Sequence, residues 1–486
     1  MWHLSWRANG DSFDVGLLAN RALARGHRVV WLEKPDGAAE AGDYLIDAGA
    51  ADLARAAGTL GVTVSRWTGR EPAGALALAR PSLALFTGEA SGYPYFAYYS
   101  LSLARLGFAY SPADGKDLAK GTLDSANLFV IPGGFATWGF DQAESAPGAD
   151  AKVRDFLGRG GAAIGSCGGA FYLSAGRPGW TGSVMAVPRY THEYLTTGVG
   201  VVAVDVAPSR LTLGCPTTME VPYYHGPVHE EVGPEARVIA RFKDLRFSGR
   251  LGIENPLDPG LFEREMKGRP AVIEASGLRG RAILFSPHPE MGDLLRKYMS
   301  LDGYVRKYLP IRGRKVMDET LTFYRSLDAP CFRLLLNAAH ALAADKLPAV
   351  APSAPAPTAA ELHDGIVRVK AATEEAWSGL GITEDDGFEG LVHDIAGRLK
   401  RDLAPAFAAL DPVLARLASG DPWAAQIAQS WHHVAGYAEA GLRADRQSNK
   451  PVAAKLLGIE LAIRLAQAWG MLARADLACT QADGRA

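Results

Sequence analysis

Two motifs in the chain carry side chains that fit nucleophilic chemistry. Cys167 follows an apolar run and is flanked by small residues, in the pattern Gly-x-Cys-x-Gly. His288 and Glu290 stand two positions apart in a His-Pro-Glu run. A thiol becomes a useful nucleophile when a base takes its proton and a third group orients that base. The combination predicts acyl-transfer chemistry, with Cys167 as nucleophile, His288 as base and Glu290 as the residue that orients the imidazole.

A pair of glycines offers a third functional part. Gly133 and Gly134 follow an apolar run that ends in a proline. Because glycine has no side chain, its backbone N–H group can approach an oxyanion that develops during acyl transfer. We expect Gly133, Gly134 and Gly168 to supply the oxyanion hole beside Cys167.

Each motif also fits a purely structural role. Cys167 fits a small buried cysteine beside a tight turn, and Gly133 and Gly134 fit a plain β-turn. His288 fits a surface or capping histidine, and Glu290 fits a cap on the helix that follows. The occurrence of all three motifs at expected strand ends favours the catalytic interpretation.

The elements that must position these motifs alternate between strands and helices. The apolar runs predict strands at 82–86, 126–132, 161–166 and 281–286, and helices at 93–106 and 149–157. Such alternation predicts an α/β fold with a doubly wound, mostly parallel sheet, whose ligands sit at the carboxyl ends of the strands. Shorter strands expected at 198–206, 219–224, 236–241 and 271–274 indicate a more antiparallel half of the sheet.

The remaining patterns divide the chain into four segments. Residues 1–78 form a small α/β domain, with strands expected at 28–32, 43–47 and 62–64 and helices at 12–25 and 50–60. Residues 79–345 contain the motifs and end in helices expected at 291–308 and 321–344. Residues 346–360 are a linker rich in proline and alanine, and 361–480 form a bundle of about four helices. His432 and His433, adjacent in that bundle, suit a surface or interface role better than a shared metal site.

The composition of the chain disfavours several classes of protein. The 486 residues carry a formal net charge of −2, which favours neither a nucleic-acid surface nor an acidic tail. The four cysteines are scattered, at Cys167, Cys215, Cys331 and Cys479. The start of the chain lacks the apolar segment of a signal peptide, and no run reaches transmembrane length. We expect a cytoplasmic protein that binds neither nucleic acid nor membrane, unless a leader was removed before Met1.

The motifs resemble a known family. Pro-Gly-Gly at 132–134, Gly-x-Cys-x-Gly at 165–169 and His-Pro-Glu at 288–290 resemble the class I glutamine amidotransferase-like superfamily over about residues 80–300. The runs at 167–172, 222–228 and 286–290 are most similar to its biotin-protein-ligase N-terminal-type branch. The resemblance implies a flavodoxin-like fold and thiol-based amide chemistry.

The N-terminal unit is similar to the small domain that joins a zinc carboxypeptidase to an amidotransferase-like domain in some bacterial proteins. This second likeness suggests a bacterial source. Neither a peptidase motif nor a biotin-ligase catalytic domain is visible in the sequence.

One position departs from the family pattern. Glutaminases of this family carry Gln four residues after the nucleophile, where this sequence has Phe171. Glutamine is therefore not the expected substrate. The residues expected around the substrate pocket are Glu89, Tyr93, Phe171, Tyr224 and His225. His225, His229 and Glu230 are close in sequence, but the Gly-Pro turn between the histidines does not favour a metal site, and no metal or cofactor is expected.

Two functions from different classes fit these patterns. The first is a cysteine-dependent hydrolase or acyl-transfer enzyme that acts on a small-molecule amide or acyl substrate and is not a standard glutaminase. The second is a catalytically silent binding or scaffold protein on the same fold, whose C-terminal helices contact a protein partner or a second copy of the chain. The presence of all three residue types of the triad favours the enzyme.

Overall fold

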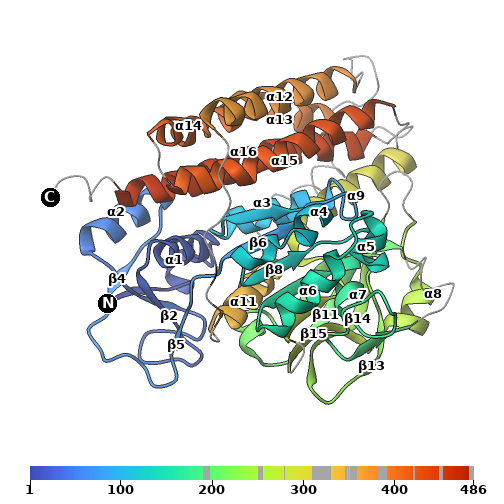
Figure 1. Cartoon of the computed structure of the whole chain (residues 1–486). Helices are drawn as coiled ribbons and strands as arrows, with labels where there is room; N and C mark the ends of the chain where they lie inside the picture. The colour runs from blue at the N-terminus through green and yellow to red at the C-terminus, as the bar shows by residue number, and fades with distance from the viewer. Residues whose placement is uncertain are drawn as a thin grey trace.

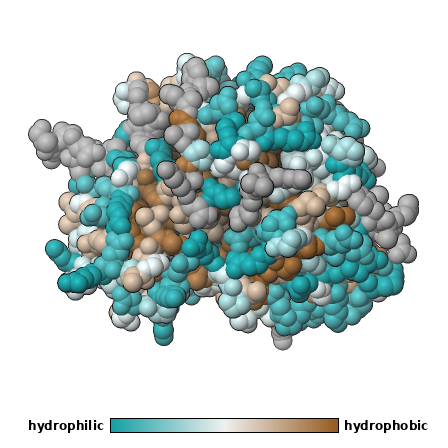
Figure 2. All heavy atoms as spheres, turned by 60° about the horizontal axis from the view of Figure 1, so that its bottom comes forward, coloured by the Kyte–Doolittle hydropathy of each residue, from teal (hydrophilic) through white to brown (hydrophobic). Residues whose placement is uncertain are grey.

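The structure is a computed structural model in which the chain forms three parts. It describes residues 1–189, 198–249, 255–277, 280–308, 330–344, 347–348, 350, 358–380, 391–419, 422–447 and 452–480. Figure 1 shows a small N-terminal unit in blue, a larger sheet region in cyan to green, and C-terminal helices in orange to red along the top. Figure 2 shows another face of the molecule, on which hydrophilic residues predominate and hydrophobic residues gather near the middle.

The N-terminal unit holds a five-stranded sheet in the order β4-β1-β3-β2-β5, with every pairing antiparallel. Its elements are β1 (Trp2–Leu4), α1 (Asp14–Ala24), β2 (Arg28–Trp31), β3 (Tyr44–Asp47), α2 (Ala50–Leu60), β4 (Ser65–Arg66) and β5 (Leu76–Ala77). The expected strand at 62–64 is wrong, because the strand there is the two-residue β4. The sequence prediction also missed β1, whose three residues are too short to show a periodic pattern.

A nine-stranded mixed sheet forms the centre of the second part. Its order is β12-β11-β14-β15-β16-β9-β8-β6-β7. The strands are β6 (Leu83–Phe86), β7 (Tyr110–Ala113), β8 (Leu128–Ile131), β9 (Ala162–Ser166), β11 (Val199–Val206), β12 (Thr218–Tyr224), β14 (Ala236–Ser248), β15 (Pro270–Gly277) and β16 (Gly280–Phe285). A separate antiparallel pair is formed by β10 (Ala186–Pro188) and β13 (His229–Val232).

The expectation of a mostly parallel sheet is wrong for half of the pairings. The strands β16, β9, β8, β6 and β7 pair in parallel, whereas β12, β11, β14, β15 and β16 pair antiparallel. Parallel neighbours need a long crossover, usually a helix, whereas antiparallel neighbours can follow one another directly. Helices separate the successive parallel strands in the sequence, whereas only a short 3-10 turn lies between the antiparallel strands β11 and β12.

The parallel half brings the motifs to one edge of the sheet. Gly133 follows β8, Cys167 follows β9 and His288 follows β16, and these three strands are neighbours. In the pairing of β16 with β9, Phe285 lies opposite Ser166, so both strands end at the same level. The Cys167 N–H then donates to the Phe285 carbonyl at 3.0 Å. The register of this pair therefore fixes where Cys167 stands relative to the residues that follow β16.

The helices of the sheet region are α3 (Tyr95–Arg105), α4 (Gly115–Ala119), α5 (Phe140–Ala143), α6 (Ala149–Gly158), α7 (Gly168–Leu173), α8 (Pro259–Leu261), α9 (Gly292–Tyr308) and α11 (Pro330–Ala344). Helix α11 packs between the sheet region and the N-terminal unit, where His340 bonds Tyr44 at 3.1 Å and Asn20 at 2.8 Å. The helix expected at 321–344 is described from Pro330 onward, and its first residues lie outside the described part of the chain.

The C-terminal part contains one helix more than the four expected among its described residues. The helices are α12 (Ala359–Ser378), α13 (Leu391–Ala408), α14 (Asp411–Ala418), α15 (Pro422–Gln447) and α16 (Val452–Thr480). Helix α16 contacts α3 and α9 of the sheet region and α2 of the N-terminal unit (Figure 1). The stretch Ala453–Ala475 is long and apolar enough to cross a membrane by composition, and 83% of its most apolar window is buried inside the structure.

Polar and aromatic contacts join these helices to the sheet region. The Lys297 ammonium lies 2.5 Å from the Glu460 carboxylate. Tyr110 on β7 receives a hydrogen bond from Ser430 at its carbonyl, and its ring lies 5.6 Å from that of Trp469. Since Trp469 is fully buried in this contact, the C-terminal helices and the sheet share one apolar interior.

The contact between Trp469 and Tyr110 leads to a stability prediction. We expect Trp469→Ala to lower the free energy of unfolding by about 3–5 kcal/mol, because it leaves a large cavity between α16 and β7. The matched control is Val367→Ala on α12, whose side chain is 49% exposed and whose change should cost less than about 0.5 kcal/mol. Denaturant unfolding measures both. Equal stability of the two variants would contradict the shared interior.

Candidate active site

Cys167 stands on a sharp turn between β9 and α7. Its φ of 50° and ψ of −110° are values that side-chain-bearing residues rarely adopt. Neighbouring glycines make room for this turn. A Cβ atom on Gly165 would lie 2.6 Å from the Gly169 backbone, and one on Gly169 would lie 2.1 Å from the Ile131 carbonyl oxygen. The small residues around Cys167 are therefore required by close backbone packing, and the turn projects the thiol from the end of β9.

The side chains of His288 and Glu290 form a buried pair beside this turn. The distance between His288 Nδ1 and Glu290 Oε1 is 2.6 Å, and both side chains are fully buried. The backbone N–H of His288 donates to the Pro222 carbonyl at 2.8 Å, which holds the residue against β12. The imidazole is thus fixed both through its ring and through its backbone.

The thiol and the imidazole meet at one carbonyl oxygen. Cys167 Sγ and His288 Nε2 each lie 3.2 Å from the Tyr224 carbonyl oxygen. The neighbouring Cys167 thiol is one of the factors that raise the pKa of His288. Gly133 packs over both, because a Cβ atom there would lie 2.8 Å from His288 Cε1 and 3.6 Å from Cys167 Sγ. A thiol, an imidazole and a carboxylate therefore lie one after another in the interior.

Burial and charge act in opposite directions on the His288 imidazole. Burial lowers its pKa, but the Glu290 carboxylate and the Cys167 thiol outweigh burial and raise the pKa to about 10. Both ring nitrogens face acceptors, Glu290 on one side and the Tyr224 carbonyl on the other. This environment stabilises the imidazolium form, which is the counter-charge that a thiolate needs.

The Gly133–Gly134 peptide is held in one orientation. Ser91 Oγ donates to the Gly133 carbonyl at 3.0 Å, and in a trans peptide the Gly134 N–H then points away from Ser91. Gly134 has φ 114° and ψ −151°, a conformation open only to glycine. Among the described residues, the N–H groups of Gly134 and Gly168 have no hydrogen-bond partner. Two adjacent donors therefore lie beside the thiol, as an oxyanion hole requires.

Of the five residues expected around the substrate pocket, Phe171, Tyr224 and His225 lie in the region of Cys167 and its neighbours. Phe171 is buried one turn after Cys167, with its ring 5.8 Å from that of Trp180. The Tyr224 ring lies 6.1 Å from that of His288, and the His225 ring packs on Tyr224 at 5.5 Å. Tyr224 therefore contacts the thiol and the imidazole, and His225 packs on Tyr224. Phe171 is joined to Cys167 through its backbone N–H, which donates to the Cys167 carbonyl at 2.9 Å.

Glu89 and Tyr93 lie elsewhere. Glu89 is exposed on the loop after β6. Tyr93 faces the C-terminal helices: its hydroxyl donates to the Gly458 carbonyl at 3.4 Å, and its ring fills the space above Gly441. No sequence pattern showed that the C-terminal helices cover this loop. The same helices place His433 against Thr87 of the loop.

Sequence reasoning missed three hydroxyl-bearing residues around the site. Ser91 orients the glycine peptide, and Ser166 and Tyr99 lie behind Glu290. Only Ser166 carried a possible signal, since it directly precedes Cys167. The other two come from the loop and helix after β6 and approach only in the folded chain.

The remaining candidate side chains do not form a second centre. Burial lowers the pKa of His229 to about 3, and its Nε2 bonds Ser174 Oγ at 3.0 Å. Burial also raises the pKa of Cys215 to about 12, in line with a packed cysteine. Within the described ranges, no group of three or more His, Cys, Asp or Glu side chains is placed to hold a metal ion.

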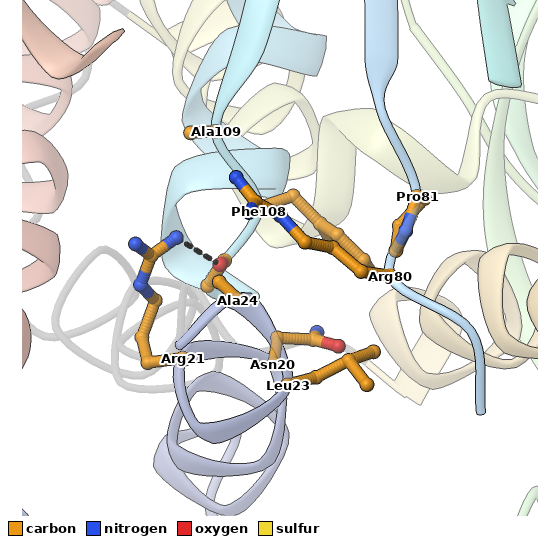
Figure 3. A pocket seen from close by; sticks show the side chains of 9 residues that line it. Asn20, Arg21, Leu23, Ala24, Arg80, Pro81, Phe108 and Ala109 are labelled. Carbon is orange, nitrogen blue, oxygen red and sulfur yellow. Dashed lines mark hydrogen bonds between the residues drawn. The ribbon is translucent and has the colours of Figure 1, made fainter. Parts of the chain in front are cut away.

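A surface pocket lies at the amino ends of the parallel strands β6 and β7. Its lining includes Asn20, Arg21 and Leu23 of α1 and Arg80, Phe108 and Ala109, which precede β6 and β7 (Figure 3). Arg21 donates to the Gly107 carbonyl there at 3.2 Å. Since Cys167 follows the carboxyl end of β9, the pocket and the thiol lie at opposite ends of the parallel strands. This pocket is not part of the candidate active site.

Comparisons with known proteins were made for sequence families, curated proteins and solved structures. No family model matches the chain, and no curated protein matches it. Similar solved structures include glutamine amidotransferase-like proteins. One glutamine amidotransferase is 16% identical over 43% of this chain and 90% of its own, with a TM-score of 0.29. Another, from Thermotoga maritima, is 13% identical over 53% of this chain and 97% of its own, with a TM-score of 0.33.

A third similar structure carries a different description. A ThuA-like protein from Bacteroides uniformis is 11% identical over 56% of this chain and 94% of its own, with a TM-score of 0.29. At these identities and TM-scores, the likeness assigns neither a reaction nor a substrate to this chain.

The packing at Gly168 leads to a mutational prediction. A Cβ atom on Gly168 would lie 2.1 Å from the Gly134 carbonyl oxygen. We expect Gly168→Ala to push the two donor peptides apart and to lower the free energy of unfolding by about 1–3 kcal/mol. The matched control is Gly58→Ala in α2, where a Cβ atom meets nothing within 4 Å. That change should stabilise the helix by about 0.5–1 kcal/mol. If denaturant unfolding finds the two variants equally stable, the proposed close packing is refuted.

The pKa of His288 leads to a pH prediction. An unfolded histidine loses its proton near pH 6.5, whereas folded His288 keeps its proton until about pH 10. The stability that His288⁺ contributes is therefore complete below pH 6.5 and is lost as the pH rises through about 10. In Glu290→Gln the carboxylate charge that opposes burial is gone, so the pKa of His288 should fall. ¹⁵N NMR of the His288 ring against pH measures both. A wild-type ring that titrates at 6.5 would contradict this account.

Proposed function

We propose that the chain is a cysteine-dependent hydrolase or acyl-transfer enzyme that acts on an amide bond. The observation that carries the proposal is the contact of three groups in series. Cys167 Sγ and His288 Nε2 lie 3.2 Å from the same carbonyl oxygen, and Glu290 holds the far nitrogen of the ring at 2.6 Å. A nucleophile, a base and a group that orients the base are the elements of covalent acyl-transfer catalysis.

In the proposed reaction, the same groups act first in the formation of a thioester on Cys167 and then in its release. The thiol proton rests on His288, whose raised pKa favours the imidazolium beside a thiolate, and the thiolate of Cys167 attacks the amide carbon. The carbonyl oxygen becomes an oxyanion that accepts hydrogen bonds from the Gly134 and Gly168 N–H groups. The C–N bond then breaks, the imidazolium gives its proton to the leaving nitrogen, and a thioester remains on Cys167.

The thioester is released by a second attack. In hydrolysis, water gives a proton to His288 and its oxygen bonds the acyl carbon, after which the C–S bond breaks. The proton returns to the sulfur, and the products are a carboxylic acid and ammonia or an amine. In acyl transfer, an amine takes the place of water.

The proposed substrate is an amide other than glutamine. Phe171 occupies the position of the Gln that glutaminases of the resembled family carry, and it packs on Trp180. An aromatic pair offers apolar surface where a glutamine-binding pocket needs hydrogen bonds. The doubly wound, flavodoxin-like description of the fold, the likeness to the biotin-ligase branch and a cytoplasmic location stay predictions of the same proposal.

The test of this function is turnover of a panel of small primary and substituted amides, followed by release of ammonia or amine. We expect Cys167→Ala to abolish turnover and His288→Ala to lower the rate by about 10²–10⁴-fold, because the general base is lost. Cys215→Ala is the matched control and should leave the rate unchanged. An active Cys167→Ala protein would refute the proposal. Ligand-induced thermal stabilisation that persists in Cys167→Ala, with no turnover in the wild type, would favour the silent binding protein.

A further inference from the structure

Two buried hydroxyl groups lie behind the Glu290 carboxylate. Ser166 Oγ donates to Glu290 Oε2 at 3.1 Å, and the Tyr99 hydroxyl lies 2.5 Å from Ser166 Oγ. Ser166 is the last residue of β9 and Tyr99 comes from α3. None of the three side chains is exposed to more than 1%. A row of hydrogen-bonded side chains thus leads through the interior from Tyr99 by way of Ser166 and Glu290 to the His288 imidazole.

The chemistry of the row fixes the direction of its hydrogen bonds. An ionised carboxylate only accepts, so the Ser166 hydrogen points to Glu290. Ser166 has a single hydrogen to give, so the bond with Tyr99 must be donated by the tyrosine. Burial, followed by the negative charge of Glu290, raises the pKa of Tyr99 well above 10, which keeps this donor protonated.

The two oxygens of Glu290 are therefore assigned to different partners. Oε1 accepts from the His288 ring and Oε2 accepts from Ser166. A carboxylate held at both oxygens cannot rotate about its terminal bond without losing a charge-assisted hydrogen bond. Without the serine donor, Oε2 would be a buried acceptor with an unmet hydrogen bond, and the carboxylate could turn away from the His288 ring.

We propose that Ser166 and Tyr99 are positioning residues that keep the Glu290 carboxylate aimed at His288, and so set the pH dependence of the reactivity of Cys167. This inference rests on the proposed function of Cys167. It adds a role for Ser166, the residue before Cys167, which contacts the Glu290 oxygen that does not face His288. Ser166 acts on Glu290 directly, and Tyr99 acts through Ser166.

The chain contains a matched control for this pair. Tyr110 donates to Ser100 Oγ at 2.7 Å, and both side chains are fully buried. This second tyrosine–serine pair has the same chemistry, but no carboxylate accepts from its serine among the described residues. Removing a hydroxyl from either pair should cost similar stability. Only the pair behind Glu290 should change the titration of the site.

The experiment is the rate of Cys167 alkylation by iodoacetamide as a function of pH, followed by peptide mass mapping in the full chain. We expect Ser166→Ala to raise the midpoint of the profile by about one pH unit, because a donor to a charged group is lost. Tyr99→Phe should shift it in the same direction by less. Ser166→Thr, which keeps the hydroxyl, should restore the wild-type midpoint. Tyr110→Phe and Ser100→Ala should leave the midpoint unchanged.

Two results separate failure of this inference from failure of the proposed function. If wild-type Cys167 reacts no faster than free cysteine at neutral pH, the proposed function itself fails. If wild-type Cys167 is reactive and Ser166→Ala, folded by circular dichroism, keeps the wild-type midpoint, the positioning role alone is overturned. An equal shift in the Tyr110→Phe and Ser100→Ala controls would also overturn it, because the effect would then not depend on Glu290.

Discussion

The parallel pairing of β9 with β16 is the constraint on which the site depends. Because Phe285 lies opposite Ser166, Cys167 leaves one strand at the level where the chain turns towards His288 on the other. A shift of one residue in this register would turn Ser166 and its neighbours to the opposite face of the sheet. The serine would then leave Glu290, and the thiol would leave the Tyr224 carbonyl. Sheet register, more than any single side-chain contact, brings Cys167 next to His288.

The candidate site also depends on close packing of the backbone at this edge of the sheet. Around Cys167, the peptides of Ile131, Gly134 and Gly169 approach at distances that exclude any Cβ atom. The Ser91 hydrogen bond then fixes the one peptide that glycine would otherwise leave free to rotate. The same loop carries Thr87 and Tyr93, which contact the C-terminal helices. Those helices therefore border the loop that orients the Gly133–Gly134 peptide, and α16, which contacts α2, α3 and α9, holds them in place.

Much of this arrangement could be predicted from the sequence, for physical reasons that particular residues show. Cys167, Gly133 and His288 each follow a run of apolar residues, and parallel strands bring such positions to one edge. The four strands of the antiparallel half were expected, but β14 and β15 are longer than expected, because charged residues among their apolar ones weaken the apolar signal. Tyr93 was assigned to the pocket because no local pattern shows which helix will cover a loop. Tyr99 and Ser91 were missed for the same reason, since their partners are distant in the sequence.

The central claim is that Cys167 forms an acyl intermediate with the help of His288. The most direct measurement is mass mapping after brief exposure of the full chain to p-nitrophenyl acetate, an activated ester that acylates reactive thiols without a specific pocket. The account predicts a burst of p-nitrophenol with one acetyl group per chain, located on Cys167, and its loss in His288→Ala. Acetyl groups spread over surface lysines or on Cys215, with Cys167 unmodified, would contradict it.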